Sequence, residues 1–216
     1  DVAPLILCPT QYNKSWSGGS YLSDLGTTMD KDIRIMWTGA TVVDMINKTD
    51  MDWINAQIQR NAYIWLNYPV NDFCIDHMLM GPTYGNDLDI AEQLSGFVSN
   101  PMEYAEASKV SLYSIADYTW NMDAYSSIAS WERALTELMP EHVDAFRLFC
   151  QHNIDLGPTG HGLRRKDESK AFKQAAEAFN AAMADGYDAA AVKAMTKEFT
   201  AMVAAADELL ASTEEP

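Results

Sequence analysis

Four short apolar segments recur in the first half of the chain, and a polar turn and a helical segment separate each from the next. They are residues 5–8, 33–37, 62–66 and 96–99. Their β-branched and aromatic side chains predict strands. Helical spacing predicts helices between them, at residues 21–29, 53–58 and 89–94. We expect Thr49 or Asp50 to cap the second helix. Strands that alternate with helices are typical of a parallel sheet, so the pattern predicts an α/β fold.

The third apolar segment has the most polar end. Pro69 follows it and cannot donate a hydrogen bond within a central sheet, so we expect the strand to stop before this residue. Asn67 and Asp72 therefore crowd at its carboxyl end, where parallel α/β folds place their binding sites. Both residue types are also typical of turns and helix caps, so that alternative interpretation stays open.

Beyond residue 100 the pattern is almost wholly helical. Helices are predicted over residues 103–120, 126–139, 141–154, 167–185 and 188–212, with a break at residues 157–162. The last two are rich in alanine and predict an antiparallel pair that turns at Gly186. Their shared stripe of Met and Phe side chains predicts the core of a helical bundle, rather than a cofactor site. Its members are Phe172, Phe179, Met183, Met195, Phe199 and Met202.

The charge balance narrows the choice of partners. The chain has 31 acidic and 15 basic residues, a net charge of −16 and a pI near 4.4. Phosphate recognition needs clustered Lys and Arg, so we expect no nucleic-acid partner and no binding to anionic membranes. No apolar run is long enough to cross a bilayer. Because the chain opens at Asp1 rather than Met, we interpret it as a mature product or an excised piece.

The three cysteines, Cys8, Cys74 and Cys150, are widely spaced and odd in number, which predicts neither a disulfide framework nor a metal site. Cys74 lies three residues from His77, but a zinc ion needs three or four ligands. We therefore expect no metal requirement.

Residues at or just after the strand ends suggest a particular ligand. Tyr12, Thr38, Asn67, Asp72 and Asn100 supply hydrogen-bonding groups, and Trp37, Trp65 and Tyr68 are aromatic neighbours in the sequence. Sugars need bidentate acceptors and amide partners for their hydroxyls, and rings that stack on their C–H faces. The sequence therefore predicts a carbohydrate site at the carboxyl ends of the strands.

Four motifs make the prediction more specific. Residues 7–12 (LCPTQY), 36–39 (MWTG), 65–72 (WLNYPVND) and 100–103 (NPME) resemble, in order and spacing, the O-GlcNAcase family, glycoside hydrolase family 84. The resemblance extends over about residues 5–165 and is closest to the bacterial enzymes, including ones named hyaluronoglucosaminidases. It implies that residues 1–120 form the C-terminal half of a (β/α)8 barrel, with four βα units, and that residues 121–216 belong to a helical bundle.

The resemblance also implies an activity and a mechanism. The family removes terminal β-linked N-acetylglucosamine with retention, using the acetamido oxygen of the substrate as the nucleophile and passing through an oxazoline. This is one of the substrate-assisted exceptions to two-carboxylate glycosidases. No cofactor is implied, and a secreted or periplasmic location in a bacterium is favoured.

Eight positions carry over from the family motifs as substrate-binding residues. Asp72 and Asn100 match residues that hold the O4 and O6 side of the sugar. Asn67 and Tyr12 match residues near the acetamido group. The remaining four match the pocket wall and its rim, and they are Trp65, Cys8, Thr38 and Val42. Two of these have plain alternatives, because Cys8 is also typical of a small core residue and Thr38 of a strand end.

The sequence departs from the family at one point. Two adjacent aspartates serve the family's chemistry, and no two aspartates are adjacent in these 216 residues. We therefore assign no catalytic residue to this chain. We expect the N-terminal half of the barrel, from the same gene product or a second chain, to complete the site. The alternatives are a non-catalytic carbohydrate-binding or scaffold fragment and, less favoured, a helical interaction protein built on residues 102–216.

Overall fold

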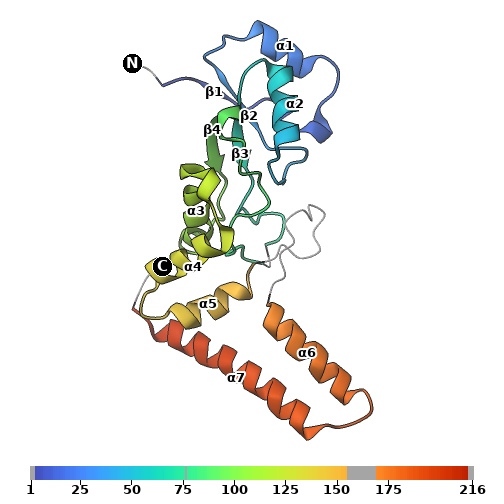
Figure 1. Ribbon diagram of the computed structural model, residues 1–216, viewed down its shortest axis with the longest axis vertical. Helices are drawn as coiled ribbons and strands as arrows, with labels where there is room; N and C mark the ends of the chain where they lie inside the picture. Colours follow the sequence, from blue (N-terminus) through green and yellow to red (C-terminus); the bar gives the residue numbers. More distant parts are fainter. Residues whose placement is uncertain (1–2, 76, 155–168, 214–216) are drawn as a thin grey trace.

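The computed structural model describes residues 3–75, 77–154 and 169–213 (Figure 1). Within these residues four strands form one sheet of order β1-β2-β3-β4, and every neighbouring pair is parallel. The strands are β1 (Ile6–Leu7), β2 (Arg34–Trp37), β3 (Ala62–Leu66) and β4 (Leu94–Ser99). The predicted parallel sheet is therefore confirmed, with β1 shorter than expected.

Helices alternate with the strands and then continue alone. They are α1 (Tyr21–Thr28), α2 (Lys48–Ile58), α3 (Ala105–Trp120), α4 (Ser127–Leu138), α5 (Val143–Gln151), α6 (Lys170–Met183) and α7 (Ala189–Ala211). Short 3₁₀ segments lie at η1 (Lys14–Trp16), η2 (Ala91–Gln93) and η3 (Met122–Ala124). No helix in the described part of the chain is long and apolar enough to span a membrane.

Two local predictions are wrong. Asn47, rather than Thr49 or Asp50, caps α2, because the Asn47 side chain accepts from the backbone N–H of Asp50 at 2.9 Å. The carboxylate of Asp50 accepts from the Asn47 side-chain Nδ2 at 2.8 Å and pairs with Lys14 at 3.0 Å. The helix expected over residues 89–94 is only the single 3₁₀ turn η2, because Leu94 already pairs with Ala62 as the first residue of β4.

The two faces of the sheet differ in burial. Ile35 and Trp37 on β2, and Ala62, Ile64 and Leu66 on β3, are fully buried. We call this side the covered face. Its coverage comes from α2, which lies against β3, and from α3, which lies against β4. In addition, the Trp37 ring packs against Trp53 of α2 at 5.6 Å.

The opposite side, the open face, is only partly buried. It carries the alternate side chains of the strands, which are Arg34, Met36, Tyr63, Trp65 and Val98 together with Gly96. A Cβ at Gly96 would lie 2.2 Å from a carbon of the Tyr63 ring, so glycine is needed where this ring crosses β4.

Arg60 ties the start of β3 to the end of α1. Its guanidinium donates to five backbone oxygens at 2.6–3.3 Å, those of Gly26, Met29, Asp30, Ile33 and Ile58. Carbonyls at a helix C-terminus have no partner within the helix, so a cation that reaches them both bonds and complements the helix dipole. One side chain thus fixes the α1–β2 connection against the α2–β3 connection.

The later helices lead away from the sheet (Figure 1). Contacts run in sequence from α3 to α4 and from α4 to α5, and α7 packs on both α5 and α6. The turn between α6 and α7 contains Gly186 at φ +131°, as predicted. The Met and Phe stripe is only partly a core, because Met195 is buried but Phe199 remains 52% exposed. Among the described helices α7 packs on α5 and α6, which leaves one side of the stripe open. The predicted break at 157–162 lies outside the described residues.

Candidate functional site

The carboxyl ends of the four parallel strands lie along one edge of the sheet. Cys8, Thr38, Asn67 and Asn100 are each the first residue after their strand, and Trp65 is the last but one of β3. Side chains alternate between the faces of a strand. Trp65 and Asn67 therefore lie on the same face as Tyr63, and Thr38 lies on the same face as Met36. By the same alternation Cys8 and Asn100 also belong to the open face. Five of the eight predicted binding residues thus belong to one face at one edge.

Asn67 and Asn100 form an amide pair at this edge. The Asn100 Nδ2 donates to Asn67 Oδ1 at 3.0 Å, and the Asn67 Nδ2 donates to the backbone oxygen of Val42 at 2.6 Å. Asn67 is nearly fully buried, and its described side-chain hydrogen bonds cap no helix. The structure therefore brings Val42, Asn67 and Asn100 together from three different strand ends.

Tyr12 joins the same group from the β1 side. Its ring lies 5.5 Å from Trp65 between centroids, in a tilted arrangement, and 5.0 Å from Trp16. Its backbone oxygen accepts from the Thr38 N–H at 2.9 Å. Six of the eight predicted residues are thus linked by described contacts, in two groups. One group is Val42, Asn67 and Asn100, and the other is Tyr12, Trp65 and Thr38.

Asp72 stands in the turn that follows β3 and is exposed. Its carboxylate makes no hydrogen bond to a described residue and caps no described helix. The turn is held near the edge because the Val70 N–H donates to the backbone oxygen of Asn100 at 2.8 Å. The cap interpretation is thus unsupported, while the carboxylate is available to a ligand.

Two aromatic residues expected beside the site lie elsewhere. Trp37 is fully buried and Tyr68 nearly so, and both belong to the hydrophobic core. The Tyr68 hydroxyl donates to the backbone oxygen of Gly81 at 2.7 Å. Each is adjacent in sequence to a residue of the open face, so strand alternation turns it to the covered side. Of the three predicted aromatic neighbours, Trp65 alone remains on the side of the site.

Cys8 is exposed, which rules out the core interpretation for this residue. Cys74 and Cys150 are buried. Desolvation raises the pKa of both the Cys8 and the Cys150 thiol, so exposure is what distinguishes Cys8. The thiolate is the nucleophile that reacts with thiol reagents, so the rate of labelling depends on the exposure and the ionisation of each thiol.

We expect a chromogenic disulfide reagent to label one thiol of the folded chain rapidly, and all three after denaturation. Cys8→Ser should abolish the rapid phase. Rapid reaction of Cys74 or Cys150 in the folded chain would contradict the burial described here.

Asp44 is a residue that sequence analysis missed. It lies between β2 and α2 and is buried, and its carboxylate accepts backbone N–H groups from Ala40, Thr41 and Met45. Burial raises the pKa of this carboxyl, while these hydrogen bonds oppose the rise. The sequence offers only the general turn propensity of an aspartate soon after Gly39, which does not show that the carboxylate reaches back to Ala40 and Thr41.

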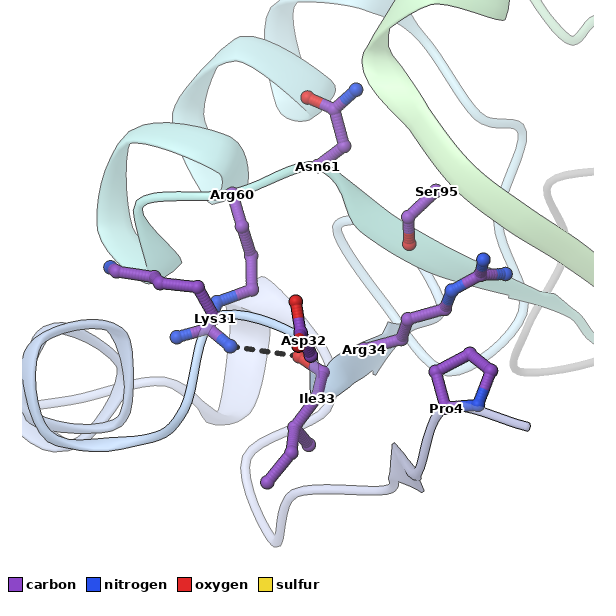
Figure 2. Close-up of a pocket in the computed structure, with 8 residues that line it drawn as sticks. All are labelled: Pro4, Lys31, Asp32, Ile33, Arg34, Arg60, Asn61 and Ser95. Atoms are coloured by element: carbon purple, nitrogen blue, oxygen red, sulfur yellow. Dashed lines mark hydrogen bonds between the residues drawn. The ribbon is translucent and has the colours of Figure 1, made fainter. Parts of the chain in front are cut away.

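A cavity of about 570 Å³ lies at the other end of the sheet (Figure 2). It is lined at the amino-terminal ends of the strands by Pro4, Lys31, Asp32, Ile33, Arg34, Arg60, Asn61 and Ser95. Arg60 is committed to backbone oxygens, and Lys31 donates to the Gly26 oxygen at 2.7 Å. Two of the three cationic side chains that line the cavity are thus already bonded to the backbone. We therefore place the functional site at the carboxyl edge of the sheet and not in this cavity.

No group of three or more His, Cys, Asp or Glu side chains able to hold a metal ion occurs among the described residues.

A family model described as β-N-acetylglucosaminidase matches residues 1–151. The chain belongs to this family, glycoside hydrolase family 84. Over 121 residues it is 30% identical to the Protein O-GlcNAcase of Rattus norvegicus and, over the same length, 29% identical to that of Mus musculus. Each alignment covers 53% of this chain but 13% of the relative, so the chain spans a small part of these proteins.

Solved structures of family 84 members extend the similarity to the whole fold. The structure of CpGH84D matches with a TM-score of 0.86 and 29% identity, covering 100% of this chain and 36% of that one. CpGH84B gives 0.81 and 31%, covering 97% and 37%. An O-GlcNAc hydrolase mutant of Thermobaculum terrenum gives 0.81 and 28%, covering 97% and 44%. The fold is thus a partial α/β barrel followed by helices, as the motifs implied.

Proposed function

We propose that this family 84 chain supplies the sugar-binding half of the active site of a glycoside hydrolase that removes terminal β-linked N-acetylglucosamine. The observation that carries the proposal is the Asn67–Asn100 amide pair, which lies at the carboxyl edge of the sheet with Trp65 and Tyr12. Fixed amides beside an aromatic ring suit a ligand with many hydroxyls and an apolar C–H face.

Each group has a role in this proposal. The exposed Asp72 carboxylate and the Asn100 side chain accept from the O4 and O6 hydroxyls. Trp65 and Cys8 border the acetamido group, with Asn67 and Tyr12 beside it, while Thr38 and Val42 form the rim. These contacts hold the sugar so that its own acetamido oxygen reaches the anomeric carbon. Such positioning converts binding energy into rate.

The proton transfers are assigned to the rest of the barrel. The proposed mechanism needs one carboxylate to orient the acetamide and another to act as general acid and then base. No two aspartates are adjacent in this sequence, so we place that pair in the N-terminal half of the barrel. In this proposal residues 1–120 form the half-barrel and residues 121–216 form the helical bundle region.

The purified 216-residue chain should release no chromophore from an aryl β-N-acetylglucosaminide, because binding groups without an acid leave the barrier largely intact. Adding the N-terminal half of the barrel, or using the gene product that contains both halves, should give turnover. Turnover by this chain alone would overturn the division of roles. The absence of turnover in the complete gene product would instead favour a carbohydrate-binding or scaffold module.

A further inference from the structure

The connection between β2 and α2 turns around the buried carboxylate of Asp44. Its Oδ2 accepts from the N–H groups of Ala40 and Thr41, the latter at 3.3 Å, and its Oδ1 accepts from the Met45 N–H at 2.8 Å. A Cβ placed on Gly39, where φ is +113°, would lie 2.7 Å from that Oδ2. The backbone is thus closed directly onto the carboxylate, a space that only glycine leaves open.

The same turn points one backbone oxygen at the site. The Thr38 hydroxyl donates to the Thr41 oxygen and the Thr41 hydroxyl to the Val43 oxygen, each at 2.8 Å. Between these two anchored oxygens, the Val42 oxygen accepts the 2.6 Å bond from Asn67 Nδ2. Asp44 holds the N–H groups of Ala40, Thr41 and Met45 on both sides of Val42, so together with the two threonine hydroxyls it fixes the segment whose tip holds the Asn67 amide.

The direction of the Asn67 amide then fixes that of Asn100. A carbonyl oxygen only accepts and an amide nitrogen only donates, so the Val42 oxygen selects the nitrogen end of Asn67. The oxygen of the Asn67 amide must then face Asn100, and it accepts a hydrogen bond from Asn100 Nδ2 at 3.0 Å. This arrangement leaves the Asn100 Oδ1 end to accept from a donor such as a sugar hydroxyl.

We propose that Asp44 is a positioning residue for the sugar site, acting through the Val42 oxygen to orient first Asn67 and then Asn100. It touches no substrate in this proposal. The inference rests on the proposed function for its effect on catalysis, but its effect on the two amides is independent of any ligand.

The ligand-free test uses the 216-residue chain with selectively ¹⁵N-labelled asparagine. The side-chain resonances are assigned by their loss in Asn67→Ala and Asn100→Ala. In Asp44→Ala we expect both amides to shift and to exchange their protons faster than in the parent. Asp44→Asn keeps the side-chain volume and one acceptor oxygen, so it should perturb the fold less and give a smaller change. The exposed Asp123→Ala is the matched control. Unchanged Asn67 and Asn100 amides in both Asp44 variants would overturn the proposal.

The catalytic test is a double-mutant cycle in the gene product that contains the complete barrel. Misplacing a binding group by a fraction of an ångström should lower kcat/KM roughly ten- to a hundredfold in Asp44→Ala. If Asp44 acts through Asn67, the same substitution made on Asn67→Ala should cost less than about threefold, because the interaction is already lost. In the Asp72→Ala background, Asp44→Ala should still lower kcat/KM by most of the factor seen in the parent.

Two outcomes separate the hypotheses. A full, additive loss on the Asn67→Ala background would overturn the positioning role and leave Asp44 as a purely structural residue. Inactivity of the unaltered gene product would overturn the proposed function, and the amide resonances would still decide the role of Asp44.

Discussion

Asp72→Ala in the gene product with the complete barrel should lower kcat/KM by roughly two to four orders of magnitude. In our proposal this carboxylate accepts from two sugar hydroxyls, and hydrogen bonds to a charged group contribute about 1.5–3 kcal/mol each. Two such bonds together contribute about 3–6 kcal/mol, which is roughly two to four orders of magnitude at tenfold per 1.4 kcal/mol. Part of the loss should fall on kcat, because the ring must distort while its O4 and O6 side stays fixed.

Asp32→Ala is the matched control for that measurement. Asp32 is also an exposed aspartate, but it lines the cavity at the amino-terminal ends of the strands. Its removal should leave kcat/KM within about threefold of the parent, as for a surface change. If Asp72→Ala also folds normally and behaves like the parent, the carboxylate belongs only to a turn, and the sugar does not lie at this edge.

Arg60→Met should lower the free energy of unfolding by about 2–4 kcal/mol. The substitution keeps much of the apolar stem but removes the donors to five backbone oxygens, and unpaired, partly buried acceptors cost about 1–3 kcal/mol each where water cannot reach them. At about 2–4 °C per kcal/mol for a chain of this size, Tm should fall by roughly 4–16 °C.

Arg34→Met tests whether this effect is specific. Arg34 lines the same cavity, and its guanidinium makes no hydrogen bond to a described residue. Thermal unfolding followed by circular dichroism should therefore show a loss below about 1 kcal/mol for Arg34→Met. Equal losses in the two variants would mean that charge in the cavity, rather than the bonds to α1, stabilises this end of the sheet.

The strands and their direction could be predicted because their signals are local. Each apolar run is short and ends in a turn, and the helices between the runs leave parallel pairing as the consistent arrangement. The alternation of side chains along β3 places the buried Leu66 on the covered face, away from the site. Applied to Trp37 and Tyr68, it would also have removed these residues from the predicted aromatic wall.

The errors arise where a tertiary contact decides between local alternatives. Asn47, Thr49 and Asp50 are all acceptable helix caps by residue type. In the fold Asp50 lies within the first turn, where its N–H donates to Asn47 and its carboxylate accepts from Asn47 Nδ2 and pairs with distant Lys14. The role of Asp44 is hidden for the same reason. Its partners are backbone N–H groups, which every sequence supplies, so only the folded turn shows that they converge.

The helical region shows a further limit of periodicity. The Met and Phe stripe correctly predicts which side of α6 and α7 is apolar, and Phe172 and Phe199 do meet, at 5.6 Å between ring centroids. Periodicity cannot tell how many helices share such a stripe. Here Phe199 stays half exposed, because α7 packs on α5 and α6 without a further described helix over it.

The most direct test of the central claim is a crystal structure of the complete gene product with N-acetylglucosamine bound. We predict the sugar at the carboxyl edge of the sheet, with its O4 and O6 hydroxyls within hydrogen-bond distance of Asp72 and Asn100 and its acetamido group beside Trp65 and Asn67. A sugar bound with full occupancy elsewhere, with these four side chains untouched, would contradict the account.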